Sequence, residues 1–286
     1  MHQIALEKWN AFSDGRSPGN PVAVVRLHTG QAVDAAPMKL LAGELQGWAN
    51  GVVTVAEGEG GYSLRFFLPG GEAPLAGHGM LAAAHSLLAA APSLCGGSLV
   101  LQAGSRLLVR AEAPGRVFVQ AAAAAPQPLP PFLDDLHWAL GLSEAQMGRE
   151  ELRFVDVGQR VLLIPMRTSS ALADLLPVWE ALGNYCDRYR VDVVLPWTAN
   201  ATMPASRWRA RAFAPRLGLR EDPASGLGNA ALGYELLRLG LWQGEPAQVE
   251  QGSSYERPNL VQLQARDSRV WFGGPARLCF SGVYHL

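Results

Sequence analysis

The feature that most constrains the fold of this 286-residue chain is a motif that occurs once in each half of the sequence. Each copy has a strand-like run containing Arg and Phe, then Glu, Pro and a Gly-x-Gly turn, and then a helix-like run rich in Ala and Leu. The recurring residues are Arg65 and Arg211, Glu72 and Glu221, Pro74 and Pro223, Gly77 and Gly226, and Gly79 and Gly228. Two copies are too few for a solenoid, so the repeat predicts a duplicated lobe.

A proline-rich stretch separates the two copies. Residues 121–131 pass from an Ala run into four prolines, a composition that is stiff and unsuited to a regular strand ladder. The chain length also suits two lobes better than one small core. We therefore predict an N-terminal lobe over residues 1–122, completed by a closing strand over 277–286, and a C-terminal lobe over 128–274.

Residue periodicity predicts both strands and helices in each lobe. The predicted strands of the first lobe are 4–12, 21–26, 51–56, 62–68, 98–102, 106–111 and 116–120, with helices over 36–46 and 80–88. The second lobe has predicted strands over 153–157, 161–166, 189–195 and 208–213, with helices over 133–140, 169–181 and 229–239. Arg alternates with Trp208, Ala210 and Ala212, which predicts a half-buried strand with its arginines on one face.

The Gly-x-Gly turns are candidate binding loops. A turn of this kind that opens a helix leaves the first N–H groups unpaired, and the helix dipole adds partial positive charge there. Two such helix starts facing across a cleft would hold a carboxylate substrate. One copy alone favours glycines that only permit tight turns. Two copies in register, with His78 in one and Asp222 in the other, favour a site.

Several classes of function are disfavoured by composition. The net charge of −1 gives no electrostatic footprint for nucleic acid or an anionic membrane. Neither glycine loop is a dinucleotide-binding or Walker motif. The N-terminal residues lack a signal-peptide pattern, and the three cysteines, Cys95, Cys186 and Cys279, lack metal-ligand spacing. We therefore expect a cytoplasmic protein with reduced thiols and without a metal, nucleic-acid or membrane partner.

Three motifs resemble those of the phenazine-biosynthesis (PhzF-like) isomerases, relatives of diaminopimelate epimerase. They are residues 10–12 together with 19–24, residues 67–78, and residues 221–226. The resemblance implies an α+β fold of two similar lobes, each a curved, mainly antiparallel sheet around a central helix. It also implies an active-site cleft between the lobes, a homodimer, and no metal, nucleotide or pyridoxal cofactor.

The chain departs from the family pattern at three positions. The family's catalytic Glu and the neighbouring Ser align with Ala49 and Trp48, and a second-loop Ser aligns with Leu227. The epimerase branch places a cysteine in each glycine loop, whereas this chain has Asp222 in the second loop and no thiol in the first. Thiol-dependent racemisation is therefore disfavoured, and the pocket is expected to be more apolar than is usual for the family.

We assign the chemistry to the remaining polar residues of the two loops. Asp222 and His78 are the candidate catalytic residues, although Asp222 could instead cap the second helix and His78 could instead bond to backbone. Glu72 and Glu221 are expected to brace the loops. The candidate substrate-binding residues are Gly77, Gly79, Ser225, Gly226, Leu227, Gly228, Trp48, Ala49 and Asn20.

These residues predict a cofactor-free isomerase that acts on a small carboxylate-bearing cyclic or conjugated metabolite of secondary metabolism. Alkylproline antibiotic pathways, which contain double-bond isomerases of this family, are a candidate setting. The missing Glu leaves open a non-catalytic small-molecule binding protein. An amino-acid racemase or epimerase is the third alternative.

Overall fold

The computed structural model describes residues 3–27, 34–68, 71–103, 105–113, 115–131, 133–253 and 256–285. The chain divides into two compact units, which are the counterparts of the two lobes expected from the sequence. Unit 1 comprises Met1–Ala121 and Trp271–Leu286, and unit 2 comprises Ala122–Val270. Unit 1 is thus completed by the C-terminal end of the chain.

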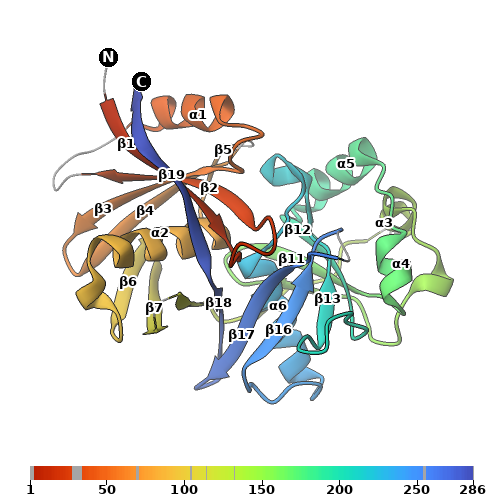
Figure 1. Ribbon diagram of the computed structural model, residues 1–286. Coiled ribbons are helices and arrows are strands. Elements are labelled where there is room, and N and C mark those ends of the chain that lie inside the picture. Colours follow the sequence, from red (N-terminus) through yellow and green to blue (C-terminus); the bar gives the residue numbers. More distant parts are fainter. Residues whose placement is uncertain are drawn as a thin grey trace. The chain divides into compact units, whose positions relative to one another are not determined.

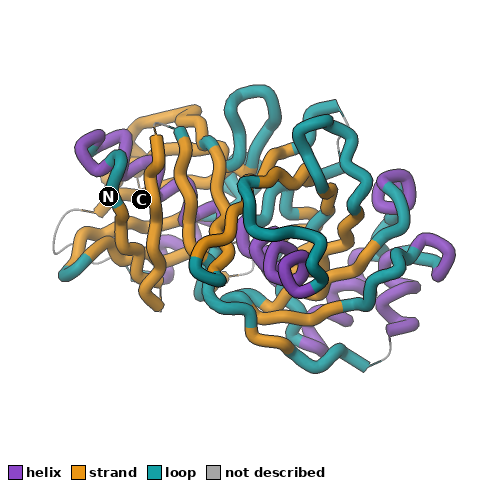
Figure 2. The backbone as a smooth tube through the Cα atoms, turned by 90° about the horizontal axis from the view of Figure 1, so that it is seen from below, coloured by secondary structure: helices purple, strands orange, loops and turns teal. Residues whose placement is uncertain are grey.

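The strands of unit 1 form one mainly antiparallel sheet. They are β1 (Gln3–Ala11), β2 (Asn20–Leu27), β3 (Val52–Gly58), β4 (Gly61–Leu68), β5 (Gly71–Ala73), β6 (Ser98–Ala103), β7 (Ser105–Ala113), β8 (Arg116–Gln120), β18 (Arg269–Gly274) and β19 (Ala276–His285). Their order is β19–β1–β2–β3–β4–β6–β7–β8–β18, with β5 beside β4. Only β2–β3 and β4–β6 are parallel among these pairs. The first and last strands lie side by side in Figures 1 and 2.

Helix α2 (Gly77–Ala90) is the central element of unit 1 (Figure 1). It packs against β1, β2, β3 and β8, which come from both halves of the sheet, so the sheet must curve around it. Its sequence is apolar on nearly every side, and 11 of its 14 residues are buried, as expected for a fully enclosed helix. Helix α1 (Ala35–Glu44) covers another face, where Met38 and Leu41 pack with Leu6 and Val25.

Unit 2 contains a second sheet and four α-helices among its described residues. Its strands are β9 (Ala125–Pro126), β10 (Arg153–Asp156), β11 (Arg160–Pro165), β12 (Val193–Thr198), β13 (Trp208–Ala210), β14 (Phe213–Ala214), β15 (Leu219–Glu221), β16 (Ala247–Gln251) and β17 (Asn259–Arg266). Its helices are α3 (Leu133–Leu140), α4 (Ser169–Ala173), α5 (Trp179–Tyr189) and α6 (Gly226–Arg238). Short 3-10 turns are η1 (Pro92–Leu94) in unit 1, and η2 (Glu144–Gln146) and η3 (Pro215–Leu217) in unit 2.

The strand pairing of unit 2 repeats that of unit 1. Strands β10, β11 and β12 pair antiparallel and then parallel, as β1, β2 and β3 do. Strands β13 and β14 together are the counterpart of β4, and β15 is the counterpart of β5. Strand β16, which pairs parallel with β13, is the counterpart of β6, which pairs parallel with β4. Helix α6 is the counterpart of α2, with 10 of its 13 residues buried. This shared pattern confirms the duplication predicted from the repeated motif.

The helix predicted over residues 169–181 is two helices in the structure, so this prediction is wrong in its extent. Thr168 caps α4 by accepting a hydrogen bond from the Ala171 N–H group, and α4 ends at Ala173. Pro177 follows, and its ring cannot continue a helix. A new helix, α5, begins at Trp179 and continues to Tyr189, beyond the predicted helix end at residue 181.

The strand predicted over residues 208–213 is also different in the structure. It is broken into β13 and β14, and its arginines are buried rather than arranged on a solvent face. Arg209 donates to Glu250 Oε2 at 3.0 Å, and Arg211 donates to Glu221. Burial of these charges is possible because each guanidinium meets a carboxylate.

The proline-rich linker holds a short ladder that its composition does not predict. Ala125 and Pro126 form β9, which pairs with β10, and the Gln127 N–H group donates to the Phe154 carbonyl oxygen at 2.8 Å. Residues Ala125 to Gln127 of the linker are therefore bonded to β10 of unit 2.

Candidate functional site

The first glycine loop forms the start of α2. Ala76 precedes the helix and supplies no side-chain cap, so Gly77, His78 and Gly79 form a first turn that no described side chain caps. Gly79 must lack a side chain, because a Cβ atom there would lie 2.9 Å from Phe66 Cδ1. The helix start can therefore offer N–H groups to a ligand while its second glycine packs directly on the sheet.

His78 is buried at this helix start. Its residue is 4% exposed, and its Nε2 atom has no hydrogen-bond partner among the described residues. A methyl group placed on Gly51 would lie 3.8 Å from that nitrogen, so the ring is directed toward the start of β3. Burial lowers the pKa of His78 from 6.5 to about 4, and the imidazole is therefore neutral at neutral pH.

Asparagine side chains surround the same end of unit 1. Asn20 begins β2, is fully buried, and accepts a hydrogen bond from Asn50 Nδ2 at 2.9 Å. Asn50 directly precedes Gly51, which faces the His78 ring. Asn20 is therefore linked to the surroundings of His78 through its hydrogen bond with Asn50. Asn10, near the end of β1, has a buried Oδ1 atom without a partner among the described residues.

Trp48 and Ala49 precede Asn50 and Gly51 in the chain. Trp48 packs edge-to-face on Phe280 at 5.7 Å between ring centroids, and Lys8 Nζ lies 4.6 Å from the Trp48 ring centre. Ala49 is 2% exposed and belongs to the apolar cluster that contains Met38. Their assignment as substrate-binding residues stays a prediction.

The second glycine loop forms the start of α6. Ser225 caps this helix by accepting a hydrogen bond from the Gly228 N–H group at 3.2 Å, so the cap is Ser225 and not Asp222. Gly226, Leu227 and Gly228 are buried in the first turn. A Cβ atom on Gly228 would lie 2.9 Å from Leu195 Cδ1, the same close packing as at Gly79.

Asp222 lies three residues before the cap and is 6% exposed. Its Oδ1 atom accepts from the Ala224 N–H group at 3.3 Å, and its own N–H group donates to the Ala212 carbonyl oxygen at 2.8 Å. The carboxylate thus belongs to a tight local turn ahead of α6.

Two buried amides from neighbouring strands hold this second loop, and the sequence motifs do not reveal them. Gln251 Nε2 donates to the Asp222 carbonyl oxygen at 2.8 Å, and Asn259 Nδ2 donates to the Pro223 carbonyl oxygen at 2.7 Å. Asn229, in the first turns of α6, donates to Gln251 but has a buried Oδ1 atom without a described partner. Such residues come from β16, β17 and α6 and share no local pattern with the glycine loop.

The two repeat glutamates form matching ion pairs. Arg65 binds Glu72 through Nε–Oε1 (2.9 Å) and Nη2–Oε2 (3.1 Å), and Arg211 binds Glu221 through Nε–Oε1 (3.0 Å) and Nη2–Oε2 (2.9 Å). The hydrogen bond from Arg65 holds the pKa of Glu72 below its ordinary value. These contacts agree with a bracing role for both glutamates, because each carboxylate is engaged by the arginine of its own motif.

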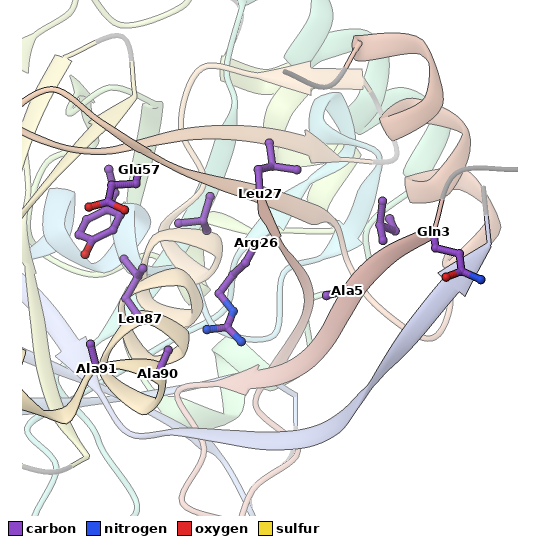
Figure 3. A pocket seen from close by; sticks show the side chains of 11 residues that line it. Gln3, Ala5, Arg26, Leu27, Glu57, Leu87, Ala90 and Ala91 are labelled. Atoms are coloured by element: carbon purple, nitrogen blue, oxygen red, sulfur yellow. The ribbon is translucent and has the colours of Figure 1, made fainter. Parts of the chain in front are cut away.

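A separate cavity of about 440 Å³ lies at the other end of α2 (Figure 3). Leu87 and Ala90 of α2 line it together with Arg26 of β2, whose guanidinium donates to Glu7 Oε1 at 2.9 Å. A helix of this length spans about 20 Å, so the cavity is remote from His78. It is therefore not part of the candidate site.

The cysteines lie outside both glycine loops. Cys186 is buried in α5, and burial raises the pKa of its thiol to about 12. Cys95 follows η1, and Cys279 is exposed on β19. In the described ranges, no three His, Cys, Asp or Glu side chains are grouped closely enough to hold a metal ion. No helix in the described part of the chain has the length and apolar character needed to cross a bilayer.

A family model described as phenazine biosynthesis-like protein (PhzC-PhzF) matches residues 9–282. The chain belongs to this family. The match spans both glycine loops and confirms the resemblance noted from the sequence motifs.

Two relatives of this family member that match over most of their length are named isomerases. The chain is 29% identical over 271 residues to the trans-2,3-dihydro-3-hydroxyanthranilate isomerase of Pseudomonas fluorescens, which covers 93% of this chain and 91% of that protein. It is also 29% identical over 285 residues to an uncharacterized isomerase of Pseudomonas aeruginosa. This match covers 99% of this chain and 100% of that protein.

A solved structure of the same family shows the fold. The phenazine biosynthesis protein of the PhzF family from Bacillus anthracis matches with a TM-score of 0.84 and 17% identity over 100% of both chains. The predicted diaminopimelate epimerase-like α+β fold is therefore confirmed.

Proposed function

We propose that this family member is a cofactor-independent isomerase that moves a proton, and with it a double bond, in a small carboxylate-bearing cyclic or conjugated metabolite. The observation that carries the proposal is His78, a buried and neutral imidazole with an unpartnered Nε2 atom at an uncapped helix start. Asp222 is its proposed partner.

The reaction needs one group that removes a proton from carbon and returns it at another carbon. We assign this step to the Asp222 carboxylate. It takes a proton from one end of the conjugated system, and the electron pair shifts along that system. The protonated Asp222 exchanges its proton with solvent and then gives a proton to the carbon at the other end. His78 donates a ring N–H hydrogen bond to the substrate carboxylate, together with the backbone N–H groups of Gly77 and Gly79.

The proposed substrate class follows from the relatives and from the residues of the second loop. The Pseudomonas fluorescens relative is named for trans-2,3-dihydro-3-hydroxyanthranilate, a cyclic acid with ring unsaturation. Leu227 is apolar where the family resemblance implies Ser, and this favours an alkyl-substituted diene acid, such as a precursor in an alkylproline-type antibiotic pathway. We also propose a homodimer, as the family resemblance implies.

A non-catalytic binding protein is the second candidate. The observation that favours it is Ala49, which aligns with the family's catalytic Glu, and the nearby Glu44 carboxylate accepts a hydrogen bond from the Tyr284 hydroxyl instead. A thiol-dependent racemase is disfavoured, because none of the three cysteines lies in the first turn of α2 or α6.

Substitution of Asp222 tests the isomerase directly. Asp222→Asn is expected to lower turnover of trans-2,3-dihydro-3-hydroxyanthranilate, or of an alkyl-substituted conjugated diene acid, by about 100-fold or more, because positioned general bases contribute about 10²–10⁴-fold. The measurement is the change in ultraviolet absorbance as the conjugated system shifts. The Asn carbonyl oxygen can still accept from Ala224, so the melting temperature is expected to remain close to that of the wild type.

The matched control is Asp187→Asn, the same chemical change on the exposed side of α5. It is expected to leave turnover unchanged. Wild-type turnover in the Asp222→Asn variant would remove Asp222 from the mechanism, whereas a wild type that converts none of these acids would contradict the proposed function.

A further inference from the structure

The side chain of Gln251 contacts both ends of the loop that carries Asp222. Gln251 ends β16 and is fully buried. Its Nε2 atom donates to the Asp222 carbonyl oxygen at 2.8 Å, and its Oε1 atom accepts from the Ser225 N–H group at 3.0 Å. One amide therefore spans the four-residue loop from the candidate base to the helix cap.

These contacts fix the backbone on both sides of the Asp222 side chain. The Asp222 N–H group is held by the Ala212 carbonyl oxygen and its carbonyl oxygen is held by Gln251, so the peptide groups that set the direction of its carboxylate are both bonded. Asn229 Nδ2 in turn donates to Gln251 Oε1 and to the Ser225 carbonyl oxygen, which keeps the amide itself in place.

Position 251 requires a donor and an acceptor on one planar group. A carboxylate would accept from Ser225 but would set an oxygen against the Asp222 carbonyl oxygen, and an apolar side chain would satisfy neither group. The strand pairing fixes where this group stands, because Gln251 pairs with Ala210 of β13 on one side and with Asn259 of β17 on the other.

Ala76 supplies no side-chain cap to α2, whereas Ser225 caps α6 and the side chains of Gln251 and Asn259 hold the second loop. A rigid second loop is what a proton transfer to and from carbon demands, since a misplacement of about 1 Å can cost about 100-fold in rate.

We propose that Gln251 is a positioning residue that aims the Asp222 carboxylate at the reacting carbon. This inference rests on the proposed function and adds to it a residue that touches no substrate. Its role is to act through Asp222, while its bond to Ser225 holds the start of α6, whose first-turn residues are candidate substrate-binding residues.

The first test is the substitution Gln251→Glu, which keeps the acceptor for Ser225 and Asn229 and removes the donor to Asp222. Turnover of the diene acid that the wild type converts fastest is expected to fall about tenfold or more in kcat, while KM changes by less than about threefold. Gln251→Met removes all three bonds and is expected to lower kcat and raise KM together. Gln248→Glu, the same change earlier on β16, is the control and is expected to behave as the wild type.

A double substitution separates positioning from mere stability. If Gln251 acts through Asp222, then Asp222→Asn combined with Gln251→Glu should turn over as slowly as Asp222→Asn alone, within about twofold. Multiplied losses in the double variant, or wild-type kcat in Gln251→Glu, would overturn the proposal. If Gln251→Glu is unfolded at the assay temperature by circular dichroism, Gln251→Met takes its place, and failure of both to fold would show a structural role instead.

The outcomes for the two proposals are distinct. A wild type that converts no diene acid overturns the proposed function and the positioning role together. A fully active Asp222→Asn variant overturns the assignment of the base to Asp222, and the positioning role with it, but leaves the isomerase function intact. An inactive Asp222→Asn variant beside a fully active Gln251→Glu variant overturns the positioning role alone.

Discussion

His78 combines burial with an unsatisfied ring nitrogen, which is a costly arrangement for a residue with only a structural role. A buried polar group without a partner costs about 1–3 kcal/mol, and the described residues leave Asn10 Oδ1 and Asn229 Oδ1 in the same condition. A ligand bound at the start of α2 would supply the partner that the described residues do not give to His78 Nε2.

The lowered pKa of His78 predicts a pH dependence of stability. The folded value of about 4 lies below the ordinary value of 6.5, so the unfolded chain binds more protons between these two pH values. The free energy of unfolding should therefore be highest above pH 6.5 and decline as the pH falls toward 4. Between pH 7.5 and pH 5 the wild type should lose about 2 kcal/mol more than His78→Gln.

Urea unfolding of both proteins at the two pH values measures this difference. An equal loss in wild type and variant would mean that His78 is not held neutral by burial.

At the scale of elements, each central helix begins where a glycine lets it pack directly against a strand. Gly79 lies against Phe66 of β4 and also against Val53 of β3, and Gly228 lies against Leu195 of β12, which is the counterpart of β3. The loops are thus positioned by the packing of α2 and α6 as well as by their own hydrogen bonds.

The close contact at Gly79 predicts a loss of stability that another helical glycine should not show. Gly79→Ala places a Cβ atom 2.9 Å from Phe66 Cδ1 and is expected to lower the free energy of unfolding by about 1–3 kcal/mol. Gly43→Ala in α1 meets no described atom within 4 Å and is expected to raise it by up to about 1 kcal/mol. Guanidinium unfolding curves compare the two, and equal effects would contradict the packing role of Gly79.

The sequence predicts the elements whose apolar residues recur with a clear period, and it misses those whose buried residues are polar. Most strands of unit 1 and helices α2, α3 and α6 are predictable for the first reason. Strands β16 and β17 are not, because Glu250, Gln251 and Gln264 are buried in them, and Glu250 and Gln251 bond to partners far along the chain. Hydrophobic periodicity cannot detect a strand whose inward face carries such groups.

At the scale of the whole molecule, the repeated motif predicts more than any single element does. It indicates the duplication, and the strand pairing of the two units agrees with it pair by pair. The same motif marks His78 and Asp222, because each is a polar residue whose equivalent position in the other copy of the motif is apolar. It does not mark Gln251 and Asn259, which reach the second loop only through the fold of β16 and β17.

The central claim, that this chain transfers a proton at carbon, is tested most directly by solvent deuterium exchange. The wild type is incubated in deuterated water with trans-2,3-dihydro-3-hydroxyanthranilate or an alkyl-substituted diene acid, and the acid is examined by proton NMR and mass spectrometry. The account predicts that deuterium enters at one carbon of the conjugated system as the double bond moves, and that Asp222→Asn abolishes this uptake. Tight binding of these acids by calorimetry, with no deuterium entering at carbon, would contradict the isomerase and indicate a binding protein.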